Sequence, residues 1–237
     1  MANVIIELNL IYCSKVIIEA MHLFKKDAQN FMKENKMIKI ILIIFLYSTV
    51  TYGYTEKKQN YRKIFNEYKI LANNGDAHAQ YYIADMFRTG EGTPKNIQQA
   101  FYWHHKSALQ GYAPGQSSLG VFYERGIGTK IDIEKALFWY KKAASQNFPL
   151  GQYNLGNLYR FNKKYQDYKK AFYWHKKAAE QNMKYSQFRL ALMYTYAKGV
   201  KKDLNQAKYW TKKALDNNHP EAKKFLKYLN SLKNLNK

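Results

Sequence analysis

The sequence predicts an all-α fold in which about four helical hairpins stack into an α-solenoid, with a capping helix at each end. Three observations support this prediction: a motif that recurs four times, helical spacing of its apolar positions, and a capping residue at a constant place in each copy. Tryptophans mark the copies, at intervals of 36, 35 and 36 residues. They are Trp103, Trp139, Trp174 and Trp210. A fixed period of this size is typical of repeats that bury their apolar faces against their neighbours.

The composition is that of a folded chain. Among 237 residues, 46% are hydrophobic and 16% are aromatic, which excludes a disordered chain. The net charge is +22, but lysine supplies 34 of the 39 basic residues and is spread along the chain. Phosphate recognition favours arginine, so this charge indicates a solvated surface rather than nucleic-acid binding. The single cysteine, Cys13, excludes an intrachain disulfide or a zinc site built on several cysteines.

Residues 37–53 have the layout of a secretory signal peptide. A lysine near the start is followed by an apolar run from Ile40 to Val50 and then by small or polar residues. Thr51 and Gly53 suit cleavage before Tyr54, and the run is short for the roughly 30 Å hydrocarbon core of a bilayer. We therefore expect a periplasmic or secreted protein that is cleaved near Gly53.

Residues 1–36 complicate this interpretation, because a signal peptide begins at the initiator methionine. We interpret Met37 as the working start and residues 1–36 as a mis-assigned extension. The alternative is a cytoplasmic extension followed by an uncleaved inner-membrane anchor, with membrane contact confined to residues 38–54.

The first predicted element of the array is an N-terminal capping helix at residues 54–76, because Gly75 lies 36 residues before Gly111. Each repeat then begins with a helix whose stripe carries an aliphatic, a small and an aromatic residue at i, i+1 and i+4. The small residue permits close approach of a second helix. These residues are Ile83, Ala84 and Phe87; Leu119, Gly120 and Tyr123; Leu155, Gly156 and Tyr159; and Leu190, Ala191 and Tyr194. A glutamine precedes each stripe, at Gln80, Gln116, Gln152 and Gln187.

A second helix is predicted to follow an Asn or Asp whose side chain can accept a free N–H of the first turn. These residues are Asn96, Asp132, Asp167 and Asp203. In the second repeat the apolar stripe is Ala136, Trp139, Ala143 and Ala144. Each second helix ends near a residue suited to the left-handed conformation, namely Gly111, Asn147, Asn182 and Asn218. A C-terminal capping helix at residues 220–237 begins with Pro220, which a first helical turn tolerates.

The stretch SLGVFYERGIGTKIDIEKALFWYKKAASQN, residues 118–147, resembles the Sel-one-like repeat (SLR) family, a relative of the tetratricopeptide repeat (TPR). The resemblance covers four repeats, 77–112, 113–148, 149–183 and 184–219. The third repeat replaces the loop glycines with RFNKKYQDYKK, and the fourth keeps only Gly199. These loops therefore need another turn geometry, and a glycine-dependent loop contact is not assumed in either.

The resemblance implies a non-enzymatic scaffold or adaptor for protein–protein interaction that needs no cofactor. It also implies a role in envelope assembly, signalling or host contact, because exported bacterial members are linked with these processes. The alternative function is a binding or hydrolytic module that holds an acidic glycan, a lipid headgroup or a cell-wall fragment on its basic surface.

The candidate partner-binding groove lies on the face of the first helices away from the aliphatic stripe, which we expect to be concave. Its residues are Tyr81, Asp85, Arg88, Ser117, Val121, Glu124, Tyr153, Asn157, Arg160, Phe188, Leu192 and Thr195. Exposed aromatics between polar groups suit a peptide or protein groove, because rigid rings anchor interfaces at low entropic cost. The alternative interpretation is that these aromatics pack against the next repeat.

Catalytic and metal-binding interpretations find little support in the sequence. His104, His105 and His175 lie just after tryptophans, but their column also holds Tyr140 and Thr211. The GEG and GIG motifs follow no strand and indicate hairpin turns rather than phosphate loops. We predict no catalytic, metal or cofactor site, and we expect lysine columns such as Lys106 and Lys142 to form a solvated outer face.

Overall fold

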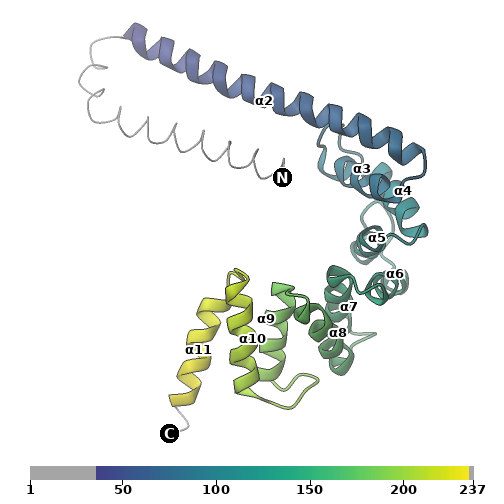
Figure 1. The fold of residues 1–237 in the computed structure, drawn as a ribbon, viewed down its shortest axis with the longest axis vertical. Coiled ribbons are helices and arrows are strands. Elements are labelled where there is room, and N and C mark those ends of the chain that lie inside the picture. The colour runs from purple at the N-terminus through teal and green to yellow at the C-terminus, as the bar shows by residue number, and fades with distance from the viewer. Residues whose placement is uncertain (1–35, 235–237) are drawn as a thin grey trace. The chain divides into compact units, whose positions relative to one another are not determined.

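The computed structural model describes residues 36–234, which form helices and no strands (Figure 1). The helices are α2 (Lys36–Asn73), α3 (Ala77–Thr89), α4 (Ile97–Leu109), α5 (Ala113–Arg125), α6 (Ile133–Ser145), α7 (Pro149–Phe161), α8 (Tyr168–Glu180), α9 (Lys184–Thr195), α10 (Leu204–Asp216) and α11 (Ala222–Asn234). Within these residues, no helix is both long enough and apolar enough to cross a membrane.

The chain divides into two compact units, residues 1–59 and residues 60–237. The boundary falls inside α2, so the expected N-terminal capping helix is the end of a longer helix that starts at Lys36 instead of residue 54. Gly53 does not interrupt this helix, because a glycine inside a helix costs only about 1 kcal/mol. The predicted extension at residues 1–36 lies outside the described residues, apart from Lys36.

The helices of the repeats pack in chain order (Figure 1). Within each repeat the two helices form a hairpin: α3 with α4, α5 with α6, α7 with α8, and α9 with α10. Each second helix also packs on the helix that follows it, and α10 packs on the C-terminal capping helix α11. In addition, α3 contacts α5 and α5 contacts α7, so neighbouring first helices touch each other directly.

The predicted caps of the second helices are confirmed. The side chains of Asn96, Asp132, Asp167 and Asp203 each accept a hydrogen bond from a backbone N–H of the first turn. The predicted left-handed residues also adopt positive φ, at 85° for Gly111, 60° for Asn147, 64° for Asn182 and 59° for Asn218. Local sequence therefore fixes both ends of each second helix.

Close helix approach in the second and third repeats depends on the predicted glycines. A Cβ added at Gly120 would lie 2.5 Å from Cε1 of Tyr140, and one at Gly156 would lie 2.9 Å from Cε1 of His175. The residue after each tryptophan is therefore the one that meets the first helix. Tyr140 is fully buried, whereas Trp139, which we placed in the stripe, is only partly buried at the edge of the core.

A buried glutamine joins neighbouring helices in every repeat. Gln116 Nε2 donates to the carbonyl oxygen of Ala108 at 3.2 Å, and its Oε1 accepts from Gln146 Nε2 at 2.7 Å. Gln80 and Gln187 make the corresponding pair of bonds to a preceding helix end and to their own second helix. In the third repeat, Gln152 accepts from Gln181 but donates to the Asn147 side chain.

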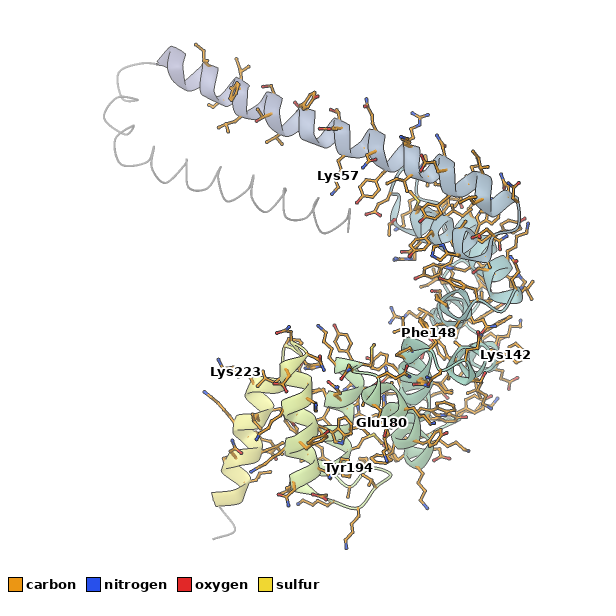
Figure 2. The ribbon with its side chains drawn as sticks, in the orientation of Figure 1. Lys57, Lys142, Phe148, Glu180, Tyr194 and Lys223 are labelled. Atoms are coloured by element: carbon orange, nitrogen blue, oxygen red, sulfur yellow. The ribbon has the colours of Figure 1, made fainter. Side chains whose placement is uncertain are left out.

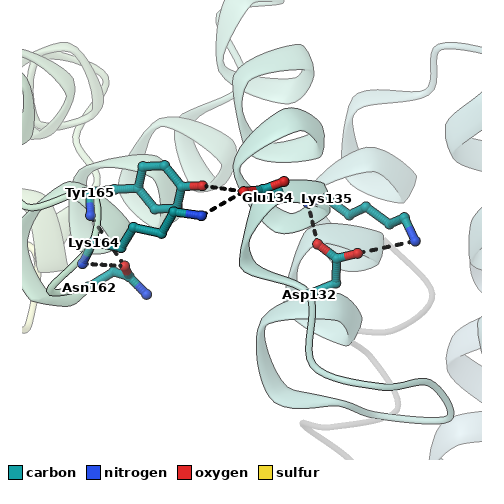
Figure 3. A network of polar contacts seen from close by, with 6 residues as sticks. All are labelled: Asp132, Glu134, Lys135, Asn162, Lys164 and Tyr165. Atoms are coloured by element: carbon teal, nitrogen blue, oxygen red, sulfur yellow. Dashed lines mark hydrogen bonds and ion pairs between the residues drawn. The ribbon is translucent and has the colours of Figure 1, made fainter.

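The third loop replaces the glycine turn with side-chain contacts, as expected (Figure 3). The backbone N–H groups of Lys164 and Tyr165 donate to Asn162 Oδ1, and their side chains reach Glu134 at the start of α6. The fourth loop keeps a glycine-dependent contact, which the sequence alone did not establish. Gly199 has φ of 73°, and a Cβ there would overlap the carbonyl oxygen of Tyr168, so this loop does need its glycine.

The glycine–tyrosine contact predicts a coupled pair of substitutions. Gly120→Ala should destabilise the protein by about 1–3 kcal/mol, because the added methyl group collides with Tyr140. Tyr140→Thr removes that ring, so the double variant should be more stable than the sum of the single effects by about 1 kcal/mol or more. Urea unfolding of the four proteins measures this coupling, and strictly additive effects would contradict it.

Candidate partner-binding surface

The twelve candidate residues lie on the first helices α3, α5, α7 and α9, three on each helix. We call this side of the four helices the first-helix face. The structure distributes its residues unevenly between solvent, neighbouring repeats and internal hydrogen bonds. These differences decide which residues are available to a partner.

Three candidate residues are buried and therefore unavailable to a partner without rearrangement. Ser117 Oγ accepts a hydrogen bond from Asn154 Nδ2 of the next repeat, and the Thr195 hydroxyl donates to the carbonyl oxygen of Ala191. Phe188 is stacked on His219, with ring centroids 4.2 Å apart, and meets Phe225 of α11 edge-on. The interpretation that aromatics pack against the next element thus holds for Phe188, because α11 covers α9 as a further repeat would.

The first two repeats satisfy their charged groups internally. In the first, Arg88 forms an ion pair with Asp85, with Nη2 2.6 Å from Oδ1. In the second, Glu124 accepts a hydrogen bond of 2.7 Å from the hydroxyl of Tyr140. Burial, followed by the charge of Glu124, raises the pKa of Tyr140, so this hydroxyl remains a donor.

Tyr81 and Val121 complete these two repeats. Tyr81 is partly buried and contacts the rings of Tyr82, His104 and Tyr112. Burial raises its pKa, so it stays protonated. Val121 packs at the edge of the main core. Both side chains are thus shared between the fold and the surface.

The third repeat leaves polar groups without partners. Tyr153, Asn157 and Arg160 are all partly buried on α7, at helical spacing on one side. Neither Asn157 Oδ1 nor Arg160 Nη1 has a hydrogen-bond partner, although both atoms are inaccessible to solvent. Tyr153 contacts the rings of His175 and Tyr185. This is the part of the first-helix face with unmet hydrogen-bonding capacity.

Arg189 of α9 belongs to the same region, although the sequence analysis did not select it. Its guanidinium carbon lies 5.6 Å from the ring centroid of Phe161, and that of Arg160 lies 4.6 Å from the same ring. The contact could not be seen in the column pattern, because the equivalent residue is Asn154 in the third repeat. From the fourth repeat, Leu192 packs partly against the cluster of Phe188 and Ala214.

The histidines near the tryptophans lie in the core or against a neighbouring ring. His104 and His175 are buried in the column that also holds Tyr140 and Thr211, and His105 stacks on Phe101. Across residues 36–234, no three His, Cys, Asp or Glu side chains gather closely enough to hold a metal ion.

The second helices present a different and regular surface, which we call the second-helix face. In each repeat an aromatic ring about half-exposed to solvent packs edge-on against the following tryptophan, with a lysine Nζ 4.9–6.0 Å from the ring centroid. The pairs are Tyr102 and Lys106, Phe138 and Lys142, Tyr173 and Lys177, and Tyr209 and Lys213. Figure 2 shows Lys142 projecting away from α6.

A shallow hollow of about 480 Å³ lies at the junction of the second and third repeats. Its lining residues are Ala144, Ser145, Asn147, Gln152, Tyr173, Trp174 and Lys177. The hollow adjoins the second-helix face, because Tyr173 and Lys177 belong to both.

Stacked hairpins with a constant core and variable surface positions define an SLR/TPR-type helical repeat protein. Comparison with protein families matches residues 77–112, 113–148, 149–183 and 184–219 to the Sel1 repeat. The chain therefore belongs to the Sel1 repeat family. Repeats of this family generally mediate protein–protein interactions and are typically non-catalytic scaffolds.

Two solved structures resemble the chain closely. A Sel1 repeat protein from Oxalobacter formigenes is 33% identical with a TM-score of 0.65, over 71% of this chain and 49% of that one. The protein c5321, described as a protective antigen of uropathogenic Escherichia coli strains with an SLR fold, is 32% identical with a TM-score of 0.66, over 70% and 36%. The chain thus spans half or less of each. A search of curated proteins gave no significant match.

The buried histidines predict a loss of stability at acidic pH. Burial lowers the pKa of His104 to about 4 and that of His175 to about 3, and at His175 the charges of Arg189 and Arg160 add to the effect. The unfolded chain binds these protons near pH 6.5, so their contribution is complete above about pH 6.5 and decreases as pH falls toward the folded-state values.

His175→Tyr tests this dependence, because Gly156 makes room at this position as Gly120 does for Tyr140. Between pH 7 and pH 5, the wild-type protein should lose about 2 kcal/mol more unfolding free energy than the variant. Urea unfolding at both pH values provides the measurement. Equal losses in the two proteins would show that His175 does not titrate on unfolding.

Proposed function

We propose that this protein is an exported scaffold or adaptor that binds a partner protein or peptide through its first-helix face. One observation carries the proposal: Asn157 Oδ1 and Arg160 Nη1 lie beside Tyr153 on this face without hydrogen-bond partners. An unsatisfied buried polar atom costs about 1–3 kcal/mol. A docked segment toward which the Asn157 and Arg160 side chains turn can supply the missing hydrogen bonds and remove that cost. Tyrosine and arginine are also the residue types that concentrate binding energy in protein interfaces.

Export is supported by residues 37–53, whose layout is that of a signal peptide. The exposed apolar side chains in the described part of this stretch, including Ile43, Phe45 and Val50, offer a surface for the export machinery. We place the mature protein in the periplasm or outside the cell, in envelope assembly, signalling or contact with host cells.

Processing by the export pathway predicts a specific N-terminus. The protein purified from its native cell should begin at or near Tyr54, as determined by mass spectrometry of the intact chain and its N-terminal peptide. A chain that retains residues 38–53 would contradict cleavage and favour the anchored alternative.

The first-helix face predicts that Tyr153 contributes strongly to partner binding. The partner is first recovered from the native cell by crosslinking, identified and purified, and its Kd is then measured for three proteins. Tyr153→Ala should raise the Kd about tenfold or more, as expected for an interface anchor. The matched control, Tyr173→Ala on the second-helix face, should change it less than about twofold. Thermal unfolding of both variants reports any loss of folding.

The second candidate function is binding of an acidic glycan, lipid headgroup or cell-wall fragment on the second-helix face. The repeated aromatic–lysine pairs favour it, because their lysines lie over half-exposed rings. In the described part of the chain, none of the four lysines of these pairs forms an ion pair; the ion pairs that lysines do form involve other lysines. The same experiment separates the two functions. Capture that is lost with Tyr173→Ala and weakens steeply with salt, but survives Tyr153→Ala, would favour the second candidate.

A further inference from the structure

The two faces of the repeats carry different cations. Four of the five arginines lie on first helices, at Arg88, Arg125, Arg160 and Arg189, whereas the second helices α4, α6, α8 and α10 carry lysines and no arginine. Arginine differs from lysine in offering a planar fork of donors that matches a carboxylate or phosphate in bidentate geometry. The distribution therefore concentrates oxyanion-recognising groups on the first helices.

Arg160 and Arg189 come together although they belong to different repeats. Both guanidinium carbons lie within 6 Å of the Phe161 ring centroid, at 4.6 and 5.6 Å. Phe161 itself is 58% exposed, and Arg160 and Arg189 beside it are each only partly buried, so a ligand approaches the pair at this ring. A single aromatic side chain at the end of α7 thus positions two cations from α7 and α9.

No carboxylate neutralises this pair among residues 36–234. Arg88 has Asp85 as its ion-pair partner, but neither Arg160 nor Arg189 has one. The carboxylate at the equivalent position of the second repeat, Glu124, is occupied by the hydroxyl of Tyr140. Burial lowers the pKa of Arg160, and the positive charge of Arg189 lowers it further.

A hydrogen-bond acceptor lies one turn away from these donors. Asn157 precedes Arg160 by three residues on α7, so their side chains share a side of the helix. Arg160 Nη1 lacks an acceptor, and Asn157 Oδ1 lacks a donor. When these side chains turn toward solvent, a peptide segment offers both: a side-chain oxyanion for the arginines and a backbone N–H for the asparagine oxygen.

We propose that Arg160 and Arg189 form a binding site for an oxyanion on a partner peptide segment, with Asn157 accepting a backbone N–H from the same segment. The oxyanion is the carboxylate of an acidic residue or the phosphoryl group of a modified one. This proposal rests on the proposed function and names the chemistry that the first-helix face recognises.

Fluorescence anisotropy with the full chain tests this site, using labelled hexapeptide probes. Hexaglutamate and a phosphoserine hexapeptide represent the two sources of the oxyanion, and hexaglutamine is the uncharged reference. Arg160→Gln and Arg189→Gln should each weaken binding of the favoured acidic probe about tenfold or more. Arg160→Lys keeps the charge but removes the fork, and should weaken binding by an intermediate factor.

Two matched controls distinguish a site from general charge attraction. Arg125→Gln removes an exposed arginine from another first helix, and Lys142→Gln removes an exposed cation from the second-helix face. Each should change the affinity less than about twofold. The proposal is overturned if either control weakens binding as much as Arg160→Gln, or if neither acidic probe binds more tightly than hexaglutamine.

Failure here is distinguishable from failure of the proposed function. If capture of the natural partner requires Tyr153 but tolerates Arg160→Gln and Arg189→Gln, the scaffold function stands and the oxyanion site is wrong. If binding of the acidic probe requires both arginines while Tyr153→Ala leaves partner capture unchanged, the oxyanion site stands and the proposal of a wider partner-binding groove is wrong.

Discussion

Each repeat depends on a buried glutamine that hydrogen-bonds to the ends of two other helices or, in the third repeat, to Asn147 in the turn after α6 instead of to the end of α6. Gln116 of α5 donates to the carbonyl oxygen of Ala108 in the last turn of α4 and accepts from Gln146 at the end of α6. Carbonyls in the last turn of a helix lack intrahelical partners, and a buried amide is costly unless it is bonded. One side chain therefore bonds a carbonyl at the end of the preceding repeat and an amide at the end of its own second helix, and its own polar atoms are paired. These bonds fix the register of the three helices.

This constant register leaves the outward positions of the first helices free to differ between repeats. The first repeat uses them for the ion pair of Asp85 with Arg88, and the second uses Glu124 to hold Tyr140. Only the third leaves a buried donor on Arg160 without an acceptor, among the residues that the structure describes. Unmet hydrogen-bonding capacity on the first helices is thus concentrated on α7, while the second helices repeat the same aromatic–lysine pair four times.

The sequence was sufficient to predict the features that depend on local chemistry. The caps at Asp132 and Asp167 and the left-handed Asn147 follow from one residue and its neighbours along the chain, and all three are confirmed. The close approach at Gly120 was predicted in kind, but its partner was not. The residue that meets Gly120 is Tyr140, because the side of α6 that faces the first helix is centred on the residue after Trp139.

The candidate surface was less predictable, because contacts between repeats determine which of its residues are exposed. Phe188 looked exposed in the pattern but is covered by His219, the last residue of the fourth repeat, and by Phe225 of α11. Arg189 was missed for the opposite reason, since its significance comes from Phe161 in another repeat. Neither contact follows from helical spacing alone, which identifies a face but not what covers it.

The most direct test of this account is site-specific photo-crosslinking in the native cell. A photoreactive phenylalanine analogue is placed at Val121 or Leu192 on the first-helix face, and at Phe138 or Tyr209 on the second-helix face. The account predicts a discrete protein adduct from the first pair of positions and none from the second. Adducts formed only from Phe138 and Tyr209 would contradict it and move recognition to the second helices.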